Sequence, residues 1–363
     1  MKPVLFVTGH VPAYRAGALE RLHAREGIEV ALFGGGSAHG GAAVDGELPF
    51  PHRRVGARRL HELARSDGYR AVVVPTGGRL ALLAAWAGAR RASRPLILWS
   101  SLWAHPRTPA HALSYPALLR LYRSADAVVT YGPHVSAYVA ARGARNIHIA
   151  AQSVENEFWR ATGASDAGDA GGDAPPALAG RAAADARFVF VGRPDVEKGA
   201  ELLGRAWRQA ALGPPRATLV LVGGADVGGA GVLAAGRLAP RELRDVYRAC
   251  DVLVVPSIAT RTFREPWGLV VNEAMNCGLA VIASDAVGAA AGGLVRDGEN
   301  GLIVPAGDAG ALADALARLA GDERLRATLG AAGANDVLAY DHDAWARGFS
   351  DALATLGLAR EGC

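Results

Sequence analysis

The sequence predicts an α/β protein made of two doubly wound domains that face each other across a cleft. Three observations support this fold class. Short β-branched runs alternate with longer Ala-, Leu- and Arg-rich stretches of helical period, as in parallel sheets covered by helices. A chain of 363 residues is long for one hydrophobic core and comfortable for two domains. The alternation also stops in a segment of low complexity and then starts again.

The first half carries strand candidates with helical stretches such as ALERLHAREG and RLALLAAWAGARR between them. The predicted strands are 4–7, 30–33, 71–74, 96–99, 127–130 and 147–150. Residues 161–185 follow, and their small, polar, repetitive composition indicates an interdomain linker or a disordered insertion. We therefore expect a first domain over residues 1–160.

The alternation resumes after the linker, and we expect a second domain over residues 186–340. Its predicted strands are 188–192, 217–224, 251–257 and 279–284, and its predicted helices are 199–211, 241–250, 267–277 and 309–320. Residues 341–363 are expected to form a last helix that crosses back to the first domain. Ligands of such sheets bind beyond the carboxyl ends of the strands, so the cleft between the domains is the expected site.

The composition excludes several classes of protein. No apolar run reaches the ~20 residues that a membrane-spanning helix needs, and the N-terminus has no signal-peptide pattern, so the cytoplasm is the expected compartment. The three cysteines are widely spaced and give neither a disulfide framework nor a zinc motif. No Walker A pattern is present, and the Asp-x-Asp of YDHDAW (340–345) is interpreted as a helix N-cap rather than a metal-nucleotide motif.

The net charge of +4 comes without a basic tract of the kind that binds nucleic acids, so we expect no nucleic-acid partner. The arginines of the first third come in pairs: Arg53-Arg54, Arg58-Arg59 and Arg90-Arg91. A solvated face is the preferred interpretation of these pairs, and a weak association with the inner face of a membrane is the alternative. Only two of the 39 basic residues are lysines, so Lys198 stands out as a position where a compact ammonium group is wanted.

A candidate anion site lies in FVFVGRPDVEKG, residues 188–199. A strand, a glycine turn and a helix N-terminus form such a site, because free backbone N–H groups and the helix dipole point the same way. Arg193 and Lys198 add two cations, which suits a diphosphate better than a single phosphate. The alternative is a solvated turn with incidental charges, and the scarcity of lysine favours anion binding.

A second candidate site lies in FREPWGLVVNEAMNCG, residues 263–278, where Glu265 and Glu273 bracket an apolar run. We expect a helix to start at Pro266-Trp267, with the proline at an early helical position. The backbone N–H groups that would then face a ligand are those of Gly268, Leu269 and Val270. A cap that complements the helix dipole would explain Glu265 but not Glu273, because a charge among apolar residues is costly unless it is paired.

The spacing of the two glutamates argues against a glycosidase pair. Eight residues of helix rise about 12 Å, whereas paired glycosidase carboxyls sit about 5–9.5 Å apart. Two separate hydroxyl-binding roles on one extended ligand fit the spacing better, since carboxylates accept well from sugar hydroxyls.

Several motifs of the second half occur in order and at normal spacing over residues 188–320. The glutamates of E-PWGLVVN-E are separated by seven residues, and VGRPDVEKG, DVLVVPS, GLAVIASDAVG and GENGLIVPAGD accompany them. Together these motifs resemble the retaining glycosyltransferases of the GT-B fold, in particular glycosyltransferase family 4 with its E-x7-E signature. The fold that this resemblance implies is a pair of Rossmann-like domains.

The resemblance also implies residue roles. Glu273 would bind the nucleotide ribose, Glu265 the hydroxyls of the donor sugar, and Arg193 with Lys198 the pyrophosphate. The other implied donor-site residues are Trp267, Gly268, Leu269 and Val270 at the helix start, and Arg237 and Leu238 in AAGRL (234–238), where the family holds the base. Such enzymes are retaining, hexosyltransferase-type, and usually need neither a metal nor a cofactor besides the nucleotide diphosphate sugar, since the cations and the helix dipole carry the leaving-group charge.

The first half resembles the family less closely. VTGHVPAYRAGALERL is similar to the first strand, loop and helix of the acceptor domain, with Gly9-His10 in place of the usual paired glycine. His105 is a candidate catalytic residue, and Gly9 and His10 are candidate donor-binding residues, although a lone histidine is more often a packed or surface residue. Trp99 and Trp103 either line an acceptor pocket or pack in the core, and packing is preferred.

These observations predict transfer of a sugar, with retention, from a nucleotide diphosphate sugar to an acceptor hydroxyl on a saccharide, a lipid-linked compound or a small natural product. A non-catalytic sugar-nucleotide-binding protein is one alternative, and it would have no reason to keep Glu265. A sugar-nucleotide epimerase of similar fold is another, and it would need an acid/base pair. A pyridoxal-dependent phosphorylase would need a Schiff-base lysine, and Lys198, the only internal one, is already assigned to the diphosphate.

Overall fold

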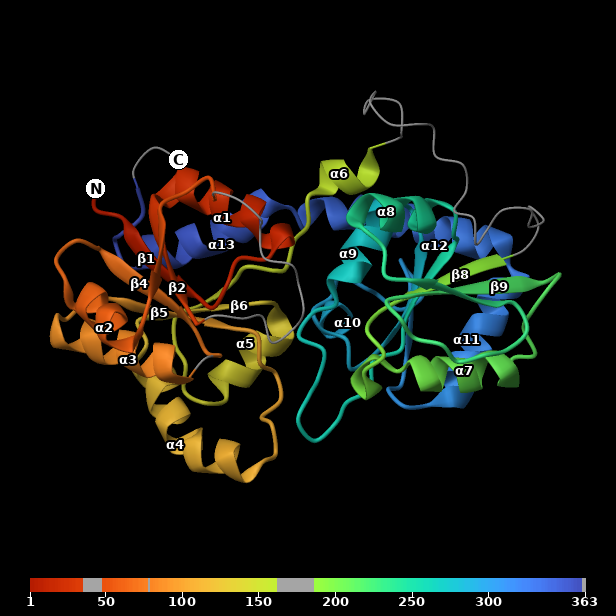
Figure 1. The fold of residues 1–363 in the computed structure, drawn as a ribbon, viewed down its shortest axis with the longest axis horizontal. Helices are drawn as coiled ribbons and strands as arrows, with labels where there is room; N and C mark the ends of the chain where they lie inside the picture. Colours follow the sequence, from red (N-terminus) through yellow and green to blue (C-terminus); the bar gives the residue numbers. More distant parts are fainter. Residues whose placement is uncertain (35–47, 78, 162–185, 361–363) are drawn as a thin grey trace. The chain divides into compact units, whose positions relative to one another are not determined.

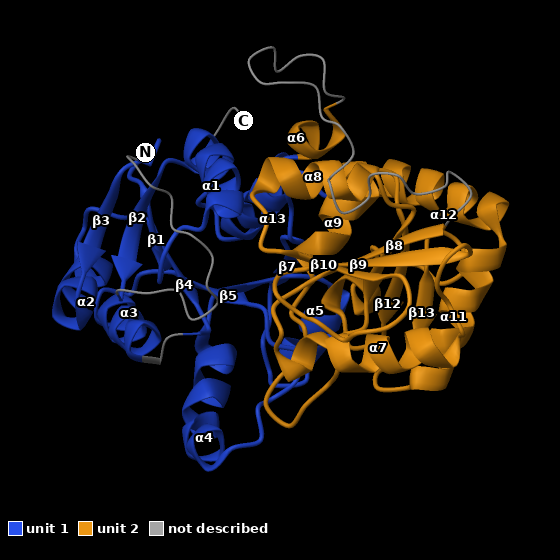
Figure 2. Cartoon of the chain, turned by 45° about the vertical axis from the view of Figure 1, so that its right-hand side comes forward, with its two compact units in different colours: residues 1–155, 340–363 blue, residues 156–339 orange. Residues whose placement is uncertain are grey.

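The computed structural model shows a chain of two compact units, drawn from two directions in Figures 1 and 2. Unit 1 comprises residues 1–155 and 340–363, and unit 2 comprises residues 156–339. The structure describes residues 1–34, 48–77, 79–161 and 186–360, so the predicted linker, apart from residue 161, lies outside the described residues. Among the described residues, no helix is both long and apolar enough to cross a membrane.

In the described part of unit 1, seven parallel strands form one sheet in the order β3-β2-β1-β4-β5-β6-β7. The strands are β1 (Val4–Thr8), β2 (Ile28–Phe33), β3 (His52–Val55), β4 (Ala71–Pro75), β5 (Leu96–Ser100), β6 (Ala127–Thr130) and β7 (Ile147–Ile149). The strand β3 was not predicted. Its sequence HRRV is polar and three of its four residues are exposed at the sheet edge, so hydrophobic periodicity gives no signal for it.

Helices cover both faces of the unit 1 sheet. They are α1 (Ala13–Glu26), α2 (Ala57–Arg65), α3 (Arg79–Arg91), α4 (Pro109–Ser124), α5 (Pro133–Ala140) and α13 (His342–Thr355). On one face α1 and α13 pack together, and the rings of Phe6, Trp345 and Phe349 meet there. The other face is covered by α2, α3 and α5. Because α13 packs on α1, β6 and β7, the C-terminal helix belongs to unit 1 although unit 2 precedes it in the sequence.

The helix α13 begins at a polar cap. The carboxylate of Asp341 accepts a hydrogen bond from the backbone N–H of Ala344 at 2.6 Å. This bond satisfies one of the donors that the first turn of a helix leaves without a partner. The interpretation of YDHDAW as a helix N-cap is confirmed.

In the described part of unit 2, six parallel strands form a sheet in the order β10-β9-β8-β11-β12-β13. The strands are β8 (Ala186–Val191), β9 (Ala217–Val222), β10 (Val232–Gly236), β11 (Val252–Val255), β12 (Ala280–Ser284) and β13 (Leu302–Val304). This is the strand order of a Rossmann fold. The order reverses between β8 and β11, and ligands of such sheets bind beyond the carboxyl ends of the strands at that point.

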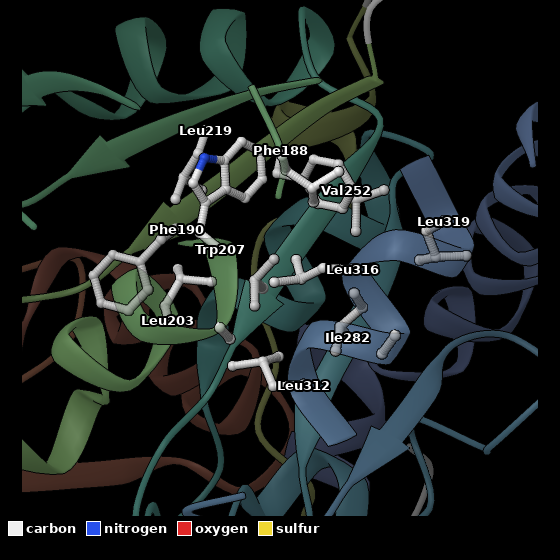
Figure 3. Packing of buried hydrophobic residues seen from close by; sticks show 14 of the residues in the cluster. Phe188, Phe190, Leu203, Trp207, Leu219, Val252, Ile282, Leu312, Leu316 and Leu319 are labelled. Atoms are coloured by element: carbon white, nitrogen blue, oxygen red, sulfur yellow. The ribbon is translucent and has the colours of Figure 1, made fainter. Parts of the chain in front are cut away.

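The helices of unit 2 sandwich its sheet around a large apolar core. They are α6 (Asn156–Arg160), η1 (Val196–Lys198), α7 (Ala200–Gln209), α8 (Pro240–Arg248), α9 (Leu269–Asn276), α10 (Gly288–Ala291), α11 (Ala309–Gly321), α12 (Glu323–Asp336) and η2 (Val337–Ala339). Figure 3 shows part of this core, where Phe188 of β8 and Trp207 of α7 meet with ring centroids 5.5 Å apart. Leu316 of α11 is fully buried in the same cluster.

The two units divide after residue 155, before the predicted end of the first domain at residue 160. The short helix α6 accounts for the difference because it packs on α9 of unit 2. The side chain of Asn276 donates to Asn156 Oδ1 at 2.8 Å, and the Cys277 thiol donates to the Trp159 carbonyl at 3.4 Å. Tertiary contacts therefore assign α6 to unit 2.

Candidate functional site

The candidate site is built at the carboxyl edge of the unit 2 sheet, beginning with the turn after β8. Here the chain forms the short 3-10 helix η1 before α7 starts at Ala200. Gly199 between them has a φ of +76°, and a Cβ at this position would lie 2.1 Å from the carbonyl oxygen of Pro256. Only glycine allows this approach, which brings the turn after β8 against the end of β11.

Two of the predicted site residues meet at this edge. Lys198 Nζ lies 2.5 Å from Glu265 Oε2, and the side chains are 25% and 10% exposed. The Ser257 hydroxyl, beyond the end of β11, donates to the same carboxylate oxygen at 3.5 Å. A largely buried carboxylate therefore stands beside an ammonium group at the point where the strand order reverses.

The other predicted cation, Arg193, forms an ion pair with Asp195. Its Nη2 atom lies 2.7 Å from Asp195 Oδ2, and both side chains are more than a third exposed. Sequence analysis did not single out Asp195, although a carboxylate two residues from an arginine in a turn is a visible signal. An exposed pair of this kind is weak and exchanges readily with a competing anion.

The loop that carries Glu265 is held by its backbone. Glu265 pairs with Val287 in an isolated parallel bridge, and its carbonyl oxygen accepts from the N–H of Gly288 at 3.0 Å. The carbonyl of Trp267 accepts from the N–H of Ala289 at 2.8 Å. The start of α10 thus fixes the position of the Glu265 side chain.

The helix after this loop starts later than predicted. It was expected over 267–277 with Pro266 at an early helical position, whereas α9 starts at Leu269 and Pro266 lies before the N-cap residue. The bonds to α10 hold residues 265–267 outside the helix, and Gly268, with a φ of +92°, turns the chain into it. Gly268, Leu269 and Val270 are partly exposed, and the first N–H groups of a helix have no partner within it.

Trp267 was expected at the donor site, and the structure places its side chain in the core. The residue is 2% exposed, and its indole Nε1 donates to Asn272 Oδ1 at 2.8 Å. The hydrogen bond and the burial anchor the start of α9, because an indole removed from water needs a partner for its N–H. Trp267 thus helps to position the start of α9.

Glu273 lies slightly more than one turn into α9, and its hydrogen-bond partner is Tyr247 of α8. The Tyr247 hydroxyl donates to Glu273 Oε2 at 3.0 Å, and Tyr247 itself is fully buried. Loss of hydration raises the pKa of Glu273 to about 7, and the hydrogen bond from Tyr247 partly opposes that rise. Burial and the nearby carboxylate raise the pKa of Tyr247 well above its ordinary value, so the phenol stays a donor.

Sequence analysis did not single out Tyr247, which lies in the predicted helix 241–250. The signal that could have identified its role is the hydroxyl itself, since a buried phenol needs a hydrogen-bond partner. Which partner it finds depends on how α8 packs beside α9. The residue is therefore missed by periodicity and found by the tertiary structure.

The predicted base-binding residues follow β10. Arg237 is exposed and Leu238 is partly buried. The carbonyl of Gly236, at the end of β10, accepts from the N–H of Gly223 at 2.6 Å, so this segment lies beside the end of β9. Because β8, β9 and β10 are parallel neighbours, all three ends reach the same edge of the sheet.

The remaining predicted residues lie in unit 1. Gly9 is exposed after β1, and the carbonyl of His10 accepts from the Thr8 hydroxyl at 3.1 Å. His105 Nε2 is 3.3 Å from the carbonyl oxygen of His111, and its ring lies 4.6 Å from that of Tyr115. These contacts place His105 at the start of α4, in a partly buried position.

Trp99 packs against other aromatic rings, which is the interpretation preferred from the sequence. Its ring lies 5.6 Å from Phe6, 5.8 Å from Tyr131 and 5.9 Å from Trp345, which puts it among the aromatic side chains between β5 and α13. Among the described residues, no cluster of three or more His, Cys, Asp and Glu side chains is arranged to hold a metal ion.

Residues 185–322 match the family model described as glycosyl transferases group 1. The matched segment lies wholly within unit 2. The matched segment contains every donor-side residue predicted in the second domain, from Arg193 to Glu273. The comparison thus covers the edge of the sheet described above.

Curated relatives match part of this chain. A D-inositol 3-phosphate glycosyltransferase of Stackebrandtia nassauensis is 39% identical over 195 residues, which is 46% of this chain and 40% of that protein. A phosphatidyl-myo-inositol mannosyltransferase of Mycobacterium leprae is 46% identical over 94 residues, 26% of this chain and 24% of that protein. The match thus spans less than half the length of these relatives.

Solved structures resemble the whole chain. The Anabaena protein HepE in complex with UDP and glucose aligns with a TM-score of 0.71 at 20% identity, over 98% of this chain and 100% of that one. Sucrose-phosphate synthase from Thermosynechococcus elongatus aligns with a TM-score of 0.72 at 22% identity, over 98% and 99%. The predicted fold class, two Rossmann-like α/β domains of the GT-B type, is confirmed.

Proposed function

We propose that this protein is a glycosyltransferase that moves a sugar from a nucleotide diphosphate sugar to an acceptor hydroxyl in the cytoplasm. The observation that carries the proposal is the meeting of Lys198 and Glu265 beside the start of α9, at the switch point of a group 1 domain. Solved neighbours of similar fold hold UDP with glucose, and UDP-glucose, which supports a nucleotide sugar as the donor.

The pyrophosphate is proposed to lie against the cations and the helix start. Lys198 has three N–H donors, so it can keep its bond to Glu265 and still donate to a phosphate oxygen. Arg193 would leave Asp195, a weak exposed partner, for the doubly charged diphosphate. The backbone N–H groups that complete the site are those of Gly268, Leu269 and Val270.

The two glutamates are proposed to bind the ends of the donor. Glu265 accepts from hydroxyls of the sugar, and its bonds to Lys198 and the α10 backbone keep the carboxylate in one place. Glu273 accepts from the ribose hydroxyls while its Oε2 atom stays bonded to Tyr247. The base is proposed to lie against the exposed segment of Arg237 and Leu238.

The reaction is proposed to retain the configuration of the sugar and to need no metal. The bond from the anomeric carbon to the leaving phosphate oxygen breaks, and the bond to the acceptor oxygen forms on the same face of the sugar. The acceptor proton passes to the leaving phosphate, and Lys198, Arg193 and the α9 dipole stabilise the charge that develops there. His105 is proposed as a further catalytic residue, and Gly9 and His10 as further donor-binding residues.

The donor can be identified by thermal shift. Uridine, guanosine, adenosine and thymidine diphosphate sugars are screened, because a ligand that binds the folded state raises the melting temperature. Transfer is then measured with inositol phosphate first, since relatives are named for acceptors of this kind. Retention follows from the anomeric configuration of the product, and metal independence from activity in the presence of a chelator.

Two results would contradict the proposal. Interconversion of the donor sugar without any acceptor would indicate an epimerase. Tight donor binding with neither transfer nor slow donor hydrolysis would indicate a sugar-nucleotide-binding protein instead.

A further inference from the structure

A basic groove lies between α3 and α4 on unit 1, outside the candidate donor site. Its volume is about 720 Å³, and it is lined by Trp86, Arg90, Pro116, Leu119, Arg120, Arg123 and Ser124. The two helices are joined along it by hydrogen bonds: Trp86 Nε1 donates to the Ser124 hydroxyl at 3.2 Å, and Arg90 donates to the Ser124 carbonyl at 2.7 Å. We call this feature the arginine groove.

The charge of the arginine groove is not balanced by nearby acids. Neither α3 nor α4 contains an aspartate or a glutamate. Among the ion pairs of the described residues, none involves Arg90, Arg120 or Arg123, and all three are exposed. An open groove with three cations and no acid on its own helices is complementary to an anionic partner.

The other arginine pairs of the first third have a different environment. Arg53 is bonded to Glu29, and Arg58 and Arg59 both lie within 3.3 Å of Glu62. Each of these arginines is thus paired with a carboxylate, and Arg58 and Arg59 share one, as expected for a solvated face. The structure therefore separates the paired arginines of β3 and α2 from the groove arginines of α3 and α4.

The same two helices expose large apolar side chains. Leu113 of α4 is 86% exposed, and Leu80 and Leu83 of α3 are 69% and 44% exposed. In the described residues, α4 buries only Leu121 and Tyr122 near its C-terminal end, and it projects from the rest of unit 1 in Figures 1 and 2. Exposed leucines are unfavourable in water, so a partner that covers them gains favourable binding free energy.

We propose that α3 and α4 dock this protein on an anionic lipid surface. Arg90, Arg120 and Arg123 contact the headgroup phosphates, while Leu113 enters the boundary between headgroups and acyl chains. A lone phosphate would satisfy the cations but leave the leucines in water, whereas the lipid interface accepts both kinds of side chain. This docking surface is independent of the proposed donor site, which lies in unit 2.

The experiment measures binding of the full chain to vesicles by flotation at low salt. We compare phosphatidylcholine vesicles with vesicles of equal parts phosphatidylcholine and phosphatidylglycerol. We expect binding to the anionic vesicles only. The triple variant Arg90→Gln, Arg120→Gln, Arg123→Gln should lose affinity on the order of a hundredfold, since each basic residue contributes near an anionic surface. Leu113→Ser should lose roughly tenfold.

The matched control is the triple variant Arg53→Gln, Arg58→Gln, Arg59→Gln, which removes the same charge from paired positions on the same unit. It should keep most of the affinity. The melting temperature of each variant shows that it is folded, and the double variant Arg120→Gln, Arg123→Gln avoids the bond from Arg90 to Ser124. An equal loss of vesicle affinity in the control variant would mean that the net charge of the protein alone determines binding.

Three outcomes overturn the proposal: no preference for anionic vesicles, equal loss in the control triple, or wild-type affinity in the groove variants. Binding to a DNA duplex that the groove variants lose, without vesicle binding, would assign the groove to nucleic acid and also overturn it. Raised salt should weaken vesicle binding, because it screens the exposed arginines.

Discussion

Lys198 of η1 and Glu265 of the loop before α9 form one ion pair, Nζ to Oε2 at 2.5 Å, although 67 residues separate them in the chain. The pair joins the turn after β8 to the segment after β11, at the point where the sheet reverses its order. Each side chain is three quarters or more removed from solvent, so loss of either partner would leave the other charge poorly solvated.

Glutamine at position 265 should separate sugar transfer from nucleotide binding. We expect Glu265→Gln to lower transfer by roughly a hundredfold or more, because an amide replaces the charged acceptor proposed for the sugar hydroxyls. The Kd for the nucleoside diphosphate without sugar should stay near that of the wild type. Glu201→Gln, on the exposed side of α7, is the control. Transfer at the wild-type rate would remove Glu265 from the donor site.

Lys198→Arg tests whether a compact ammonium group is needed. The planar guanidinium cannot occupy the place of Nζ beside Glu265 Oε2 without displacing its neighbours. The variant therefore keeps the positive charge but should not keep normal binding of the diphosphate. We expect affinity for the nucleoside diphosphate to fall about tenfold or more, with little change for the uncharged nucleoside. Isothermal titration with both ligands measures the difference, and an equal fall for both would point to a general structural effect.

Glu273 should make the stability of the ligand-free protein depend on pH. Its pKa is about 7 in the folded protein against an ordinary value of 4.5, so the folded state binds the proton more tightly. The contribution of this raised pKa to the free energy of unfolding is complete below about pH 4.5, and it is lost as the pH rises through about 7. Glu273→Gln does not titrate, so its stability relative to the wild type should rise across this window, by about 3 kcal/mol at most. Urea unfolding of both proteins at the two ends of this pH range measures the difference in their free energies of unfolding. A difference that does not change with pH would contradict the prediction.

Tyr247→Phe should move the pH dependence of nucleotide binding. If the ribose contact needs the Glu273 carboxylate, wild-type affinity should weaken as the pH falls below about 7. The Tyr247 hydrogen bond lowers the pKa of Glu273, so its removal should shift this midpoint to higher pH.

The control for Tyr247 is Tyr122→Phe, which removes a buried hydroxyl bonded to Ser100 in unit 1. Both variants should lose comparable stability, since each leaves one buried hydrogen bond unmade. Only Tyr247→Phe should shift the midpoint. Identical pH profiles for the two variants would show that Tyr247 acts on stability alone.

Local patterns were enough to predict most of the sheet elements and the βα turns of unit 2. The turn after β8 and the loop before α9 carry their glycines, cations and carboxylates within a few residues of a strand end, so sequence order already places them at one edge. The strands β3, β10 and β13, all at sheet edges, escaped prediction, and β3 gave no signal because an edge strand needs no apolar face. The late start of α9 was missed because bonds to α10 decide it.

Long-range packing decided the rest of the candidate site. Trp267 resembles a ligand-facing residue in the linear sequence, and only its burial and its bond to Asn272 place it in the core. Tyr247 resembles a core residue, and only the packing of α8 beside α9 makes it the partner of Glu273. The bond between Glu265 and Lys198 likewise exists only because β8 and β11 are neighbours.

The sequence by itself determined the fold class, and its resemblance to a known family implied the donor-side residues. The fold class follows from period and composition, which are properties of neighbouring residues. The tertiary structure decided which side chains meet, which glutamate is held by which partner, and which arginines stay unneutralised on α3 and α4. Such pairings depend on contacts between distant segments, whose geometry no local pattern contains.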